Sequence, residues 1–505
     1  MRLDTCFSKL ENISRKLFFI LFGIFLTGFS AVSLLFTTYY GSNYAERPLY
    51  SSDKFILLII IFILVISALF IFDKRFGIEK INTGRLRMAL MIYTIVVGIF
   101  WVFTSCNTIG ADQKSVSELA SQFCDNNFSG LKEGGYLFIY PFQLGMTAFL
   151  EVVYRISGKG NYTVFQLLNV LFLCVSFFAM YKITDIFFKK NKVNNILLIL
   201  LFGCFPPILY CTFVYGNIMS MMLCLISVWM QLHYLESGRT RYFIISALSI
   251  SLAVIIKSNS LIVLAAMVIM FIMDFIRKRR LRQLGLSAVL VFTVFMSGVW
   301  LNTFYEKRSG IEINEGAPKI LWAAMGLQEG NLAPGWYNKY TLNTYTQSDY
   351  DEGKAINQAE ESINNSLEAF IENPAYAAEF FYEKFVSQWN DPTYEGFWIS
   401  GVHYRNSSDQ LLNSIYYGNI HSISAAFMNS YQFIIIFGAL CFVILERKRI
   451  GANEMFLAMI IFGGFLFHMI WEAKGQYIMT YFVMLIPYSA AGVNAVLELA
   501  KRKAS

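Results

Sequence analysis

The amino-acid sequence predicts an all-α protein that crosses a membrane many times. Of its 505 residues, 56% are hydrophobic and only 15% are charged, and the mean hydropathy is +0.50. This balance is too apolar for a chain of ordinary soluble domains. The apolar residues also fall into runs of about 20, the length that a helix needs to cross ~30 Å of hydrocarbon.

Twelve such runs follow one another along the chain. The first is too long, and too closely followed by others, to be only a cleaved secretory signal, whose apolar region spans about 7 to 15 residues. We therefore expect it to remain as an anchor. The runs are residues 17–37, 55–73, 86–105, 163–187, 194–213, 217–235, 242–257, 259–275, 284–304, 425–445, 453–471 and 476–497.

Positive charges cluster in the short loops between the runs. A net charge of +7 would also suit a nucleic-acid-binding protein, but the basic residues recur in alternate loops, as the positive-inside rule requires of cytoplasmic loops. We therefore expect a cytoplasmic amino terminus. The clusters are Arg2, Lys9, Arg15 and Lys16; Lys74, Arg75, Lys80, Arg85 and Arg87; Lys189, Lys190 and Lys192; Arg239 and Arg241; Arg277 to Arg280 with Arg282; Arg447 to Arg449; and Lys501 to Lys503.

One further apolar stretch, Leu137 to Ile156, would reverse this charge pattern if it were a span. Its Pro141, Glu151 and Arg155 would be costly facing lipid but suit a helix lying in the interface with a polar stripe. We therefore expect an outer-surface helix there. The predicted segments are N-terminal transmembrane helices (1–105), a first outer loop (106–160), a transmembrane core (161–304), an extracytoplasmic domain (305–424) and C-terminal transmembrane helices (425–505).

The extracytoplasmic domain differs from the rest of the chain in composition. It has 16 Asp or Glu and 7 Lys or Arg residues, a net charge of −9. Lys354 to Glu372 reads as a helix, and Pro374 is typical of the start of another that runs toward Trp389.

Metal and nucleotide motifs are absent from the sequence. There is no CxxC, no HExxH and no Gly-rich phosphate loop before a helix. The four histidines are far apart in sequence, which disfavours a zinc site. Cys106 and Cys124 fall in or beside the first outer loop and can form a disulfide in an oxidising compartment.

Asp112 is the first candidate site residue. It follows the third span directly, so its carboxylate is expected at the water–lipid boundary, where partial desolvation raises basicity. Such a group can deprotonate an acceptor hydroxyl. The alternative is a helix cap, because Asp often caps and a helix is expected near 114–126.

Lys257 ends the seventh run, at a tight turn before the eighth, on the predicted outer face. Positive charge there opposes the topological bias and implies a partner such as a phosphate. The alternative is a lysine that snorkels to the interface.

The outer turn between the last two runs combines a carboxylate, an ammonium and a phenol in Glu472, Lys474 and Tyr477. Such a turn can hold a lipid-linked phosphate and a sugar hydroxyl together. The alternative is an aromatic belt with a local ion pair. Weaker outer-face candidates are Tyr140, Gln143, Tyr215 and Asn217.

In this order of motifs the chain resembles the GT-C membrane glycosyltransferases, most closely their protein mannosyltransferase and aminoarabinose transferase branch. The resemblance covers roughly residues 86 to 497 and rests on an outer loop that opens with Asp112, a surface helix with Tyr140-Pro141, a Lys-bearing outer turn and a late Glu-x-Lys-x-x-Tyr. It implies a GT-C-like bundle of about 12 helices with outer juxtamembrane helices and a small helical extracytoplasmic domain.

The resemblance also implies a function. The family moves a sugar from a polyprenyl-phosphate donor to an extracytoplasmic glycan, lipid or protein, usually with inversion. Asp112 would then be the catalytic carboxylate. Lys257, Lys474 and Tyr477 would bind the donor phosphate, and the substrate-binding residues would be Tyr140, Gln143, Tyr215, Asn217 and Glu472.

Two departures from the family pattern concern cofactors and charge. Many relatives carry an acidic residue where this chain has Gly216-Asn217, so the sequence does not support a bound divalent metal, and no cofactor is assigned. Gln476 stands where relatives place an Arg, which leaves fewer cations for the phosphate.

The alternative functions are a polysaccharide polymerase or ligase, and a transporter or flippase of lipid-linked sugars. Ion-coupled carriers need ionisable groups at the bilayer midplane, and the runs are nearly free of them.

Overall fold

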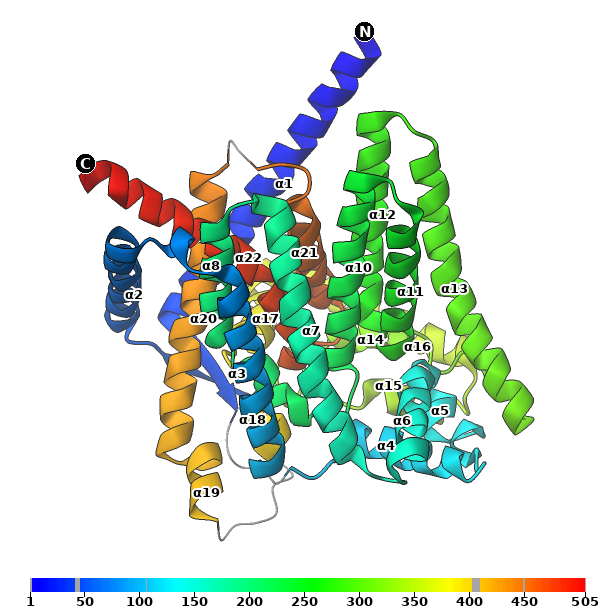
Figure 1. Cartoon of the computed structure of the whole chain (residues 1–505). Coiled ribbons are helices and arrows are strands. Elements are labelled where there is room, and N and C mark those ends of the chain that lie inside the picture. Colours follow the sequence, from blue (N-terminus) through cyan, green and yellow to red (C-terminus); the bar gives the residue numbers. More distant parts are fainter. Residues whose placement is uncertain (1, 41–45, 106, 402–408, 448–449, 505) are drawn as a thin grey trace.

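The structure is a computed structural model that describes residues 2–40, 46–105, 107–401, 409–447 and 450–504. Cys106, Lys448 and Arg449 lie outside the described residues. Within the described ranges the regular structure is helical apart from one two-stranded sheet. Figure 1 shows long helices running side by side, with shorter helices gathered at one end of them. The predicted all-α polytopic membrane architecture is confirmed.

Each of the twelve predicted runs lies largely in helical structure. Nine helices in the described part of the chain are long and apolar enough to cross a membrane. They are α1 (Arg2–Leu35), α2 (Phe55–Phe76), α3 (Thr83–Thr104), α7 (Tyr162–Phe188), α10 (Asn217–Ser237), α12 (Leu261–Lys278), α13 (Arg282–Ser309), α20 (Asn419–Leu445) and α22 (Gly475–Ala504).

The three remaining runs depart from a simple span. The run at 194–213 is bent by 49° between α8 (Asn191–Phe202) and the pair formed by α9 (Pro206–Leu209) and the 3-10 turn η4 (Tyr210–Thr212). Pro206 and Pro207 lack the backbone N–H that a continuing helix would need there. The other two, α11 (Thr240–Ile256) and α21 (Met455–Ile470), are apolar but shorter, with 17 and 16 residues.

The basic loops gather at one end of the bundle. Lys189 after α7 pairs with Glu236 of α10 at 3.2 Å. Lys192 of α8 and Lys501 of α22 both pair with Asp73 of α2, at 2.6 and 2.8 Å. Two 3-10 turns complete the loops between spans: η1 (Ile78–Lys80) lies at this end, and η5 (Ser258–Ser260) lies at the opposite one.

The first loop after α3 forms a compact group of short elements at the end opposite the basic loops (Figure 1). It comprises α4 (Ala111–Cys124), η2 (Ser129–Leu131), α5 (Tyr136–Ile139), η3 (Pro141–Gln143) and α6 (Leu144–Ser157). The predicted continuous helix from Leu137 to Ile156 was wrong. The chain bends by 105° at Tyr140, because proline disfavours helical geometry in the residue before it, and the longer segment α6 alone forms the apolar helix.

The polar stripe predicted on α6 pairs within the protein. Glu151 is buried and accepts hydrogen bonds from Tyr305 at 2.7 Å and from Arg308 at 2.9 Å, both on α13, while Arg155 on its own helix pairs with it at 2.6 Å. This network fixes α6 against the end of α13. Nearby Cys124 forms no disulfide with another described residue, and its predicted pairing with Cys106 lies outside the described residues.

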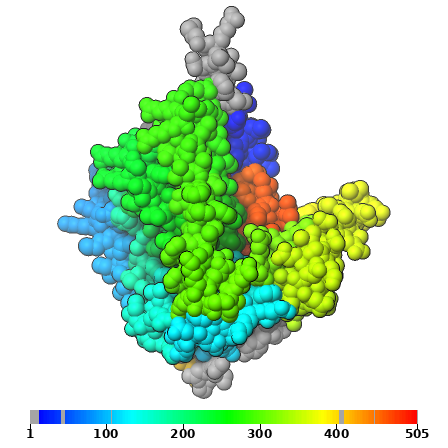
Figure 2. All heavy atoms as spheres, turned by 90° about the vertical axis from the view of Figure 1, so that its right-hand side faces the viewer, coloured from blue at the N-terminus to red at the C-terminus, as the bar shows by residue number. Residues whose placement is uncertain are grey.

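The predicted extracytoplasmic domain folds as a set of short helices: α14 (Ile320–Gly326), α15 (Tyr340–Gln347), α16 (Glu352–Glu372), α17 (Pro374–Trp389), α18 (Gly396–Gly401) and α19 (Gln410–Tyr417). The helix starting at Pro374 begins as predicted, with the Asn373 side chain accepting a hydrogen bond from the backbone N–H of Tyr376 as the N-cap. Part of this domain, yellow in Figure 2, projects beside the helical bundle.

A β-hairpin between α1 and α2 was not predicted. Strands β1 (Phe36–Tyr40) and β2 (Pro48–Ser52) pair antiparallel. Thr38 donates its hydroxyl to the carbonyl of Val386 at 2.9 Å, and its backbone N–H bonds the carbonyl of Asn390. The hairpin is thereby tied to the end of α17. Beneath it, Phe25 of α1 packs edge-on against Trp389, so the first helix is part of the core.

Candidate functional site

Asp112 lies in the first turn of α4, at the end of the bundle opposite the basic loops. The helix N-cap is Gly110 rather than Asp112, and no side-chain cap bond forms there. The cap alternative therefore does not describe Asp112. Its carboxylate is exposed and accepts a hydrogen bond from the hydroxyl of Tyr136 at 3.1 Å. The helix N-terminus also favours a negative charge at this position.

Lys257 follows the last residue of α11 and reaches across to the start of α10. Its Nζ donates to Oδ1 of Asn217 at 2.9 Å and lies 5.0 and 5.2 Å from the ring centres of Tyr215 and Tyr477. These two aromatic faces attract the ammonium without neutralising it. Among the described residues, no carboxylate forms an ion pair with Lys257.

Burial lowers the pKa of Lys257 to about 7, and the negative charge of Asp112 opposes that shift. Glu472 opposes it as well, whereas Lys474 adds to it. The structure thus brings together in one electrostatic environment the acid and the two amines that the sequence places in three separate loops.

Asn217 and Gln143 hold the aromatic wall of this site. The Asn217 amide also donates to the backbone carbonyl of Gln476 at 3.1 Å, which ties the start of α10 to the start of α22. Gln143 donates to the hydroxyl of Tyr215. Tyr140 packs against the ring of Tyr136, with 5.2 Å between the ring centres.

Glu472 lies in the turn between α21 and α22. It is buried, with 5% of its surface exposed, and accepts a hydrogen bond from the hydroxyl of Tyr477 at 3.1 Å. Burial raises its pKa to about 7, which the charge of Lys474 opposes. The loop between α14 and α15 also fixes this turn, because the Ala473 backbone N–H donates to the carbonyl of Gly335 at 2.8 Å.

Lys474 pairs with a residue that sequence reasoning missed. Its Nζ lies 3.0 Å from Oε1 of Glu46, which precedes strand β2, and 5.9 Å from the ring centre of Tyr337. The negative charges of Glu46 and Glu472 hold the pKa of Lys474 above its usual value although burial opposes them. Lys474 is therefore a compensated cation and Lys257 an uncompensated one. The role of Lys474 as a phosphate ligand stays a prediction.

Two other residues of the site were also missed. Tyr136 stands one residue before the stretch predicted as a surface helix, although its place one turn before the Tyr-Pro pair is typical of an interfacial residue. Glu395 is fully buried and accepts from the backbone N–H of Gln476 at 3.3 Å. Burial and the charge of Glu46 raise its pKa. No local pattern around Glu395 announces a buried carboxylate.

The described residues contain no group of three or more His, Cys, Asp or Glu side chains arranged to hold a metal ion. At the position where relatives carry an acid, Asn217 is committed to Lys257 and to Gln476. The residues here do not fit a bound divalent cation.

Comparison with known proteins finds a similarity in the transmembrane core. Residues 144–301, which include Tyr215, Asn217 and Lys257, match the family described as dolichyl-phosphate-mannose-protein mannosyltransferase. No curated protein matches the chain in sequence. One similar solved structure is ArnT from Cupriavidus metallidurans bound to undecaprenyl phosphate, with 13% identity over 83% of this chain and 79% of that one and a TM-score of 0.37. The family match covers residues 144–301 of the 505, and over this part the chain is similar to that mannosyltransferase family, in line with the resemblance that the sequence predicts.

Proposed function

We propose that the protein transfers a sugar from a polyprenyl-phosphate donor to an extracytoplasmic glycan, lipid or protein, with inversion at the anomeric carbon. The matched family is described by a donor of this kind, dolichyl phosphate mannose. The observation that carries the proposal is Lys257. Its ammonium is half-buried between Tyr215 and Tyr477 and has no carboxylate partner among the described residues, and the charge of Asp112 acts to raise its pKa.

Lys257 is placed to bind the phosphate of the donor. A half-buried cation that lacks a counter-ion is unfavourable, and a phosphate would offset this with a charge-assisted hydrogen bond. As the glycosidic bond breaks, negative charge develops on the leaving phosphate, and a fixed cation stabilises it. The faces of Tyr215 and Tyr477 hold the ammonium in position for this task.

Asp112 is placed to accept the proton of the acceptor hydroxyl. It is exposed and therefore accessible to an acceptor, and the Tyr136 hydroxyl orients its carboxylate. A base on one side of the anomeric carbon and a phosphate ligand on the other suit a single displacement with inversion. No cytosolic energy source is required, because the donor already carries an activated bond.

Glu472 is a second candidate for the base. Its pKa of about 7 suits general base catalysis near neutral pH. Its carboxylate is buried, however, and bonded to Tyr477. We assign Glu472 to substrate binding through Tyr477, and the experiment below compares both acids.

The arrangement of charges favours transfer over transport. Asp274 lies at the end of α12 and pairs with Arg277 and Lys278, at 2.7 and 2.9 Å. Asp185 on α7 accepts from Asn194. These acids stabilise the basic end of the bundle rather than forming a proton or ion path at midplane.

We expect the purified protein, incubated with a panel of polyprenyl-phosphate sugars, to release polyprenyl phosphate from one of them. Asp112→Asn should lower transfer by about 10² to 10⁴-fold, the usual contribution of a general base. Thermal unfolding should not change, because the Asp112 side chain is exposed. Transfer is measured with radiolabelled donor, and stability by the unfolding midpoint in detergent.

Asp125→Asn is the matched control, since this exposed acid lies at the other end of α4 and pairs with Lys159. It should keep full activity. If Asp112→Asn transfers normally while Glu472→Gln does not, the base is Glu472 and the assignment is wrong. Movement of intact donor across vesicles without cleavage would replace the transferase by a flippase.

A further inference from the structure

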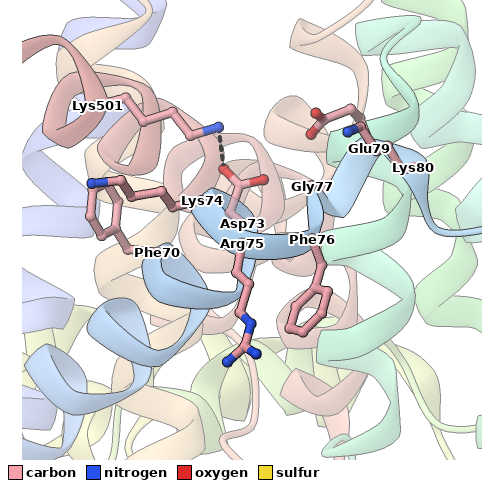
Figure 3. Close-up of a pocket in the computed structure, with 9 residues that line it drawn as sticks. All are labelled: Phe70, Asp73, Lys74, Arg75, Phe76, Gly77, Glu79, Lys80 and Lys501. Carbon is pink, nitrogen blue, oxygen red and sulfur yellow. Dashed lines mark ion pairs between the residues drawn. The ribbon is translucent and has the colours of Figure 1, made fainter. Parts of the chain in front are cut away.

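A cavity with a cationic lining lies at the end of α2, far from the candidate active site. It has a volume of about 340 Å³ and is bounded by the end of α2, by η1 and by the last turns of α22. Figure 3 shows Lys501 reaching toward Asp73 on one wall, with Glu79 and Lys80 opposite, while Lys74 and Arg75 extend from the end of α2.

The acid at the base of the cavity is already neutralised. Asp73 pairs with Lys192 at 2.6 Å and with Lys501 at 2.8 Å, and its Oδ1 accepts from the backbone N–H of Ile78 at 2.9 Å. Lys192 pairs with Glu498 as well, at 2.5 Å. The two acids, Asp73 and Glu498, and the two lysines of this group have no net charge together. Lys501 is therefore already paired and is not available to bind an anion.

The remaining charges leave the cavity positive. Lys74, Arg75 and Lys80 are exposed, and no ion pair joins any of them to a carboxylate of the described residues. Arg75 lies over the ring of Phe76, 5.2 Å from its centre. Only Glu79 offsets these three cations among the lining residues. The cavity therefore suits an anion.

The position of the cavity indicates where that anion comes from. α2 is the most apolar of the long helices and only 6% of its most apolar window is buried, so its sides face lipid along almost their whole length. Exposed Ile71, Phe72 and Phe76 lead directly to the cavity. A group bound there would lie at the depth of phospholipid headgroups, with acyl chains along α2.

The bias of Lys and Arg toward cytoplasmic loops explains why these residues are basic. It does not explain why they border a cavity whose internal acid is already paired. We propose that the cavity binds the phosphate of an anionic phospholipid headgroup. Basic pockets between transmembrane helices on the cytoplasmic side recognise such lipids.

The test measures lipid retention by the full-length protein in nanodiscs that contain phosphatidylcholine and phosphatidylglycerol. Native mass spectrometry counts bound phosphatidylglycerol for the wild type and for Lys74→Ala/Arg75→Ala/Lys80→Ala. Each cation near the surface should contribute about fivefold in affinity, so the triple variant should lose roughly 100-fold. Donor cleavage in detergent should not change, because all three residues are remote from the candidate site.

The matched control is Lys190→Ala/Arg239→Ala/Arg241→Ala, which removes three exposed cations from the same end of the bundle. It should retain phosphatidylglycerol. Equal losses in the two triple variants would mean a diffuse surface attraction and would overturn the proposal.

A second arm uses only the wild type, so it does not depend on folding of a variant. Phosphatidylglycerol should raise the unfolding midpoint more than phosphatidylcholine does, and inorganic phosphate alone should not reproduce the rise. No difference between the two lipids would overturn the site, and full stabilisation by inorganic phosphate would overturn the lipid as its source.

Discussion

The two ends of α22 carry buried charges that are handled in opposite ways. At its last turns, Asp73 contacts Lys192 and Lys501 directly, and every charge in that group has an opposite partner within 3 Å. Near its first residues, and among the described side chains, Lys257 contacts an amide and two rings, and the Glu472 carboxylate contacts a phenol, with no ion pair to either. Folding alone would favour the first arrangement.

This difference separates charges that stabilise the fold from charges that are kept for a ligand. Burial also moves the pKa of both uncompensated groups to about 7, downward for Lys257 and upward for Glu472. Perturbed groups of this kind are typical of functional sites. Lys474 is intermediate, because it sits in the same turn as Glu472 but is paired with Glu46.

The largest effect is expected for Lys257→Met. This substitution should abolish most of the transfer activity without lowering the stability of the fold. Transfer, measured as kcat/KM for the donor, should fall about 10² to 10³-fold, as when one stabilising group at a developing negative charge is removed. The unfolding midpoint should stay or rise, because an apolar side chain replaces an unpaired buried charge. Lys190→Met, at an exposed position on the other face, is the control. Loss of folding in Lys257→Met alone would make Lys257 a structural residue.

Sequence reasoning predicted the spans and the outer-end candidates because both depend on local signals. Apolar runs of about 20 residues define helices in lipid, and polar groups at their ends stand out against them. The bends in the helices occur at Pro141 and Pro206, because proline disrupts helical geometry. The bend at Pro141 was not predicted from the sequence. The sequence indicated that Asp112, Lys257 and Glu472 lie near one another only because all three were predicted on the outer face of the membrane.

The β-hairpin and Glu46 could not be predicted in this way. Strands β1 and β2 are five residues each and are held partly by α17, whose contribution through Val386 and Asn390 lies about 350 residues away in the chain. Short strands have weak local signals, and their stability depends on tertiary partners. Glu46 reaches Lys474 only because this hairpin docks. The sequence therefore predicted a free phosphate-binding amine where the structure has an ion pair.

Asp73→Asn tests the compensated end of the comparison. It leaves the buried Lys192 with only the half-exposed Glu498 as a partner, so the free energy of unfolding should fall by about 2 kcal/mol. This is less than the usual cost of breaking a fully buried pair, because Lys501 and Glu498 reach solvent. Chemical denaturation in detergent measures it, and activity per folded molecule should not change. Asp185→Asn, which loses one hydrogen-bonded carboxylate on the same side, should cost less. Equal costs would mean that pairing at Asp73 adds nothing.

The pH dependence of donor binding distinguishes the two lysines. The pKa of Lys257 is near 7 in the unliganded protein, so its amine is increasingly neutral above pH 7. To bind phosphate there, it must first take up a proton. A bound phosphate raises that pKa, so donor affinity should be greatest below pH 7 and weaken by up to about tenfold for each pH unit above it. Lys474, whose pKa is held high, adds no such slope. Binding of polyprenyl phosphate measured from about pH 6 to 9 checks this. Lys257→Arg should lose the part of the slope that Lys257 contributes, because arginine stays protonated. A weaker slope can remain from Glu472, whose pKa is also about 7, and an unchanged slope would mean that Lys257 does not bind the phosphate.

The smallest expected effect comes from Glu46→Gln. This substitution removes the ion pair of Lys474 and leaves it without a charged partner, as Lys257 is. With its partner neutralised, the ammonium should be free to contact the donor phosphate. Affinity for polyprenyl phosphate should then rise by a few fold, equivalent to about 1 kcal/mol for a mostly buried pair. Isothermal titration in detergent measures the change. The gain must vanish in a Lys474→Met background, since the effect acts through that amine. If Glu46→Gln weakens binding in both backgrounds, the hairpin positions the turn rather than masking a cation, and the assignment of Lys474 to the phosphate loses its support.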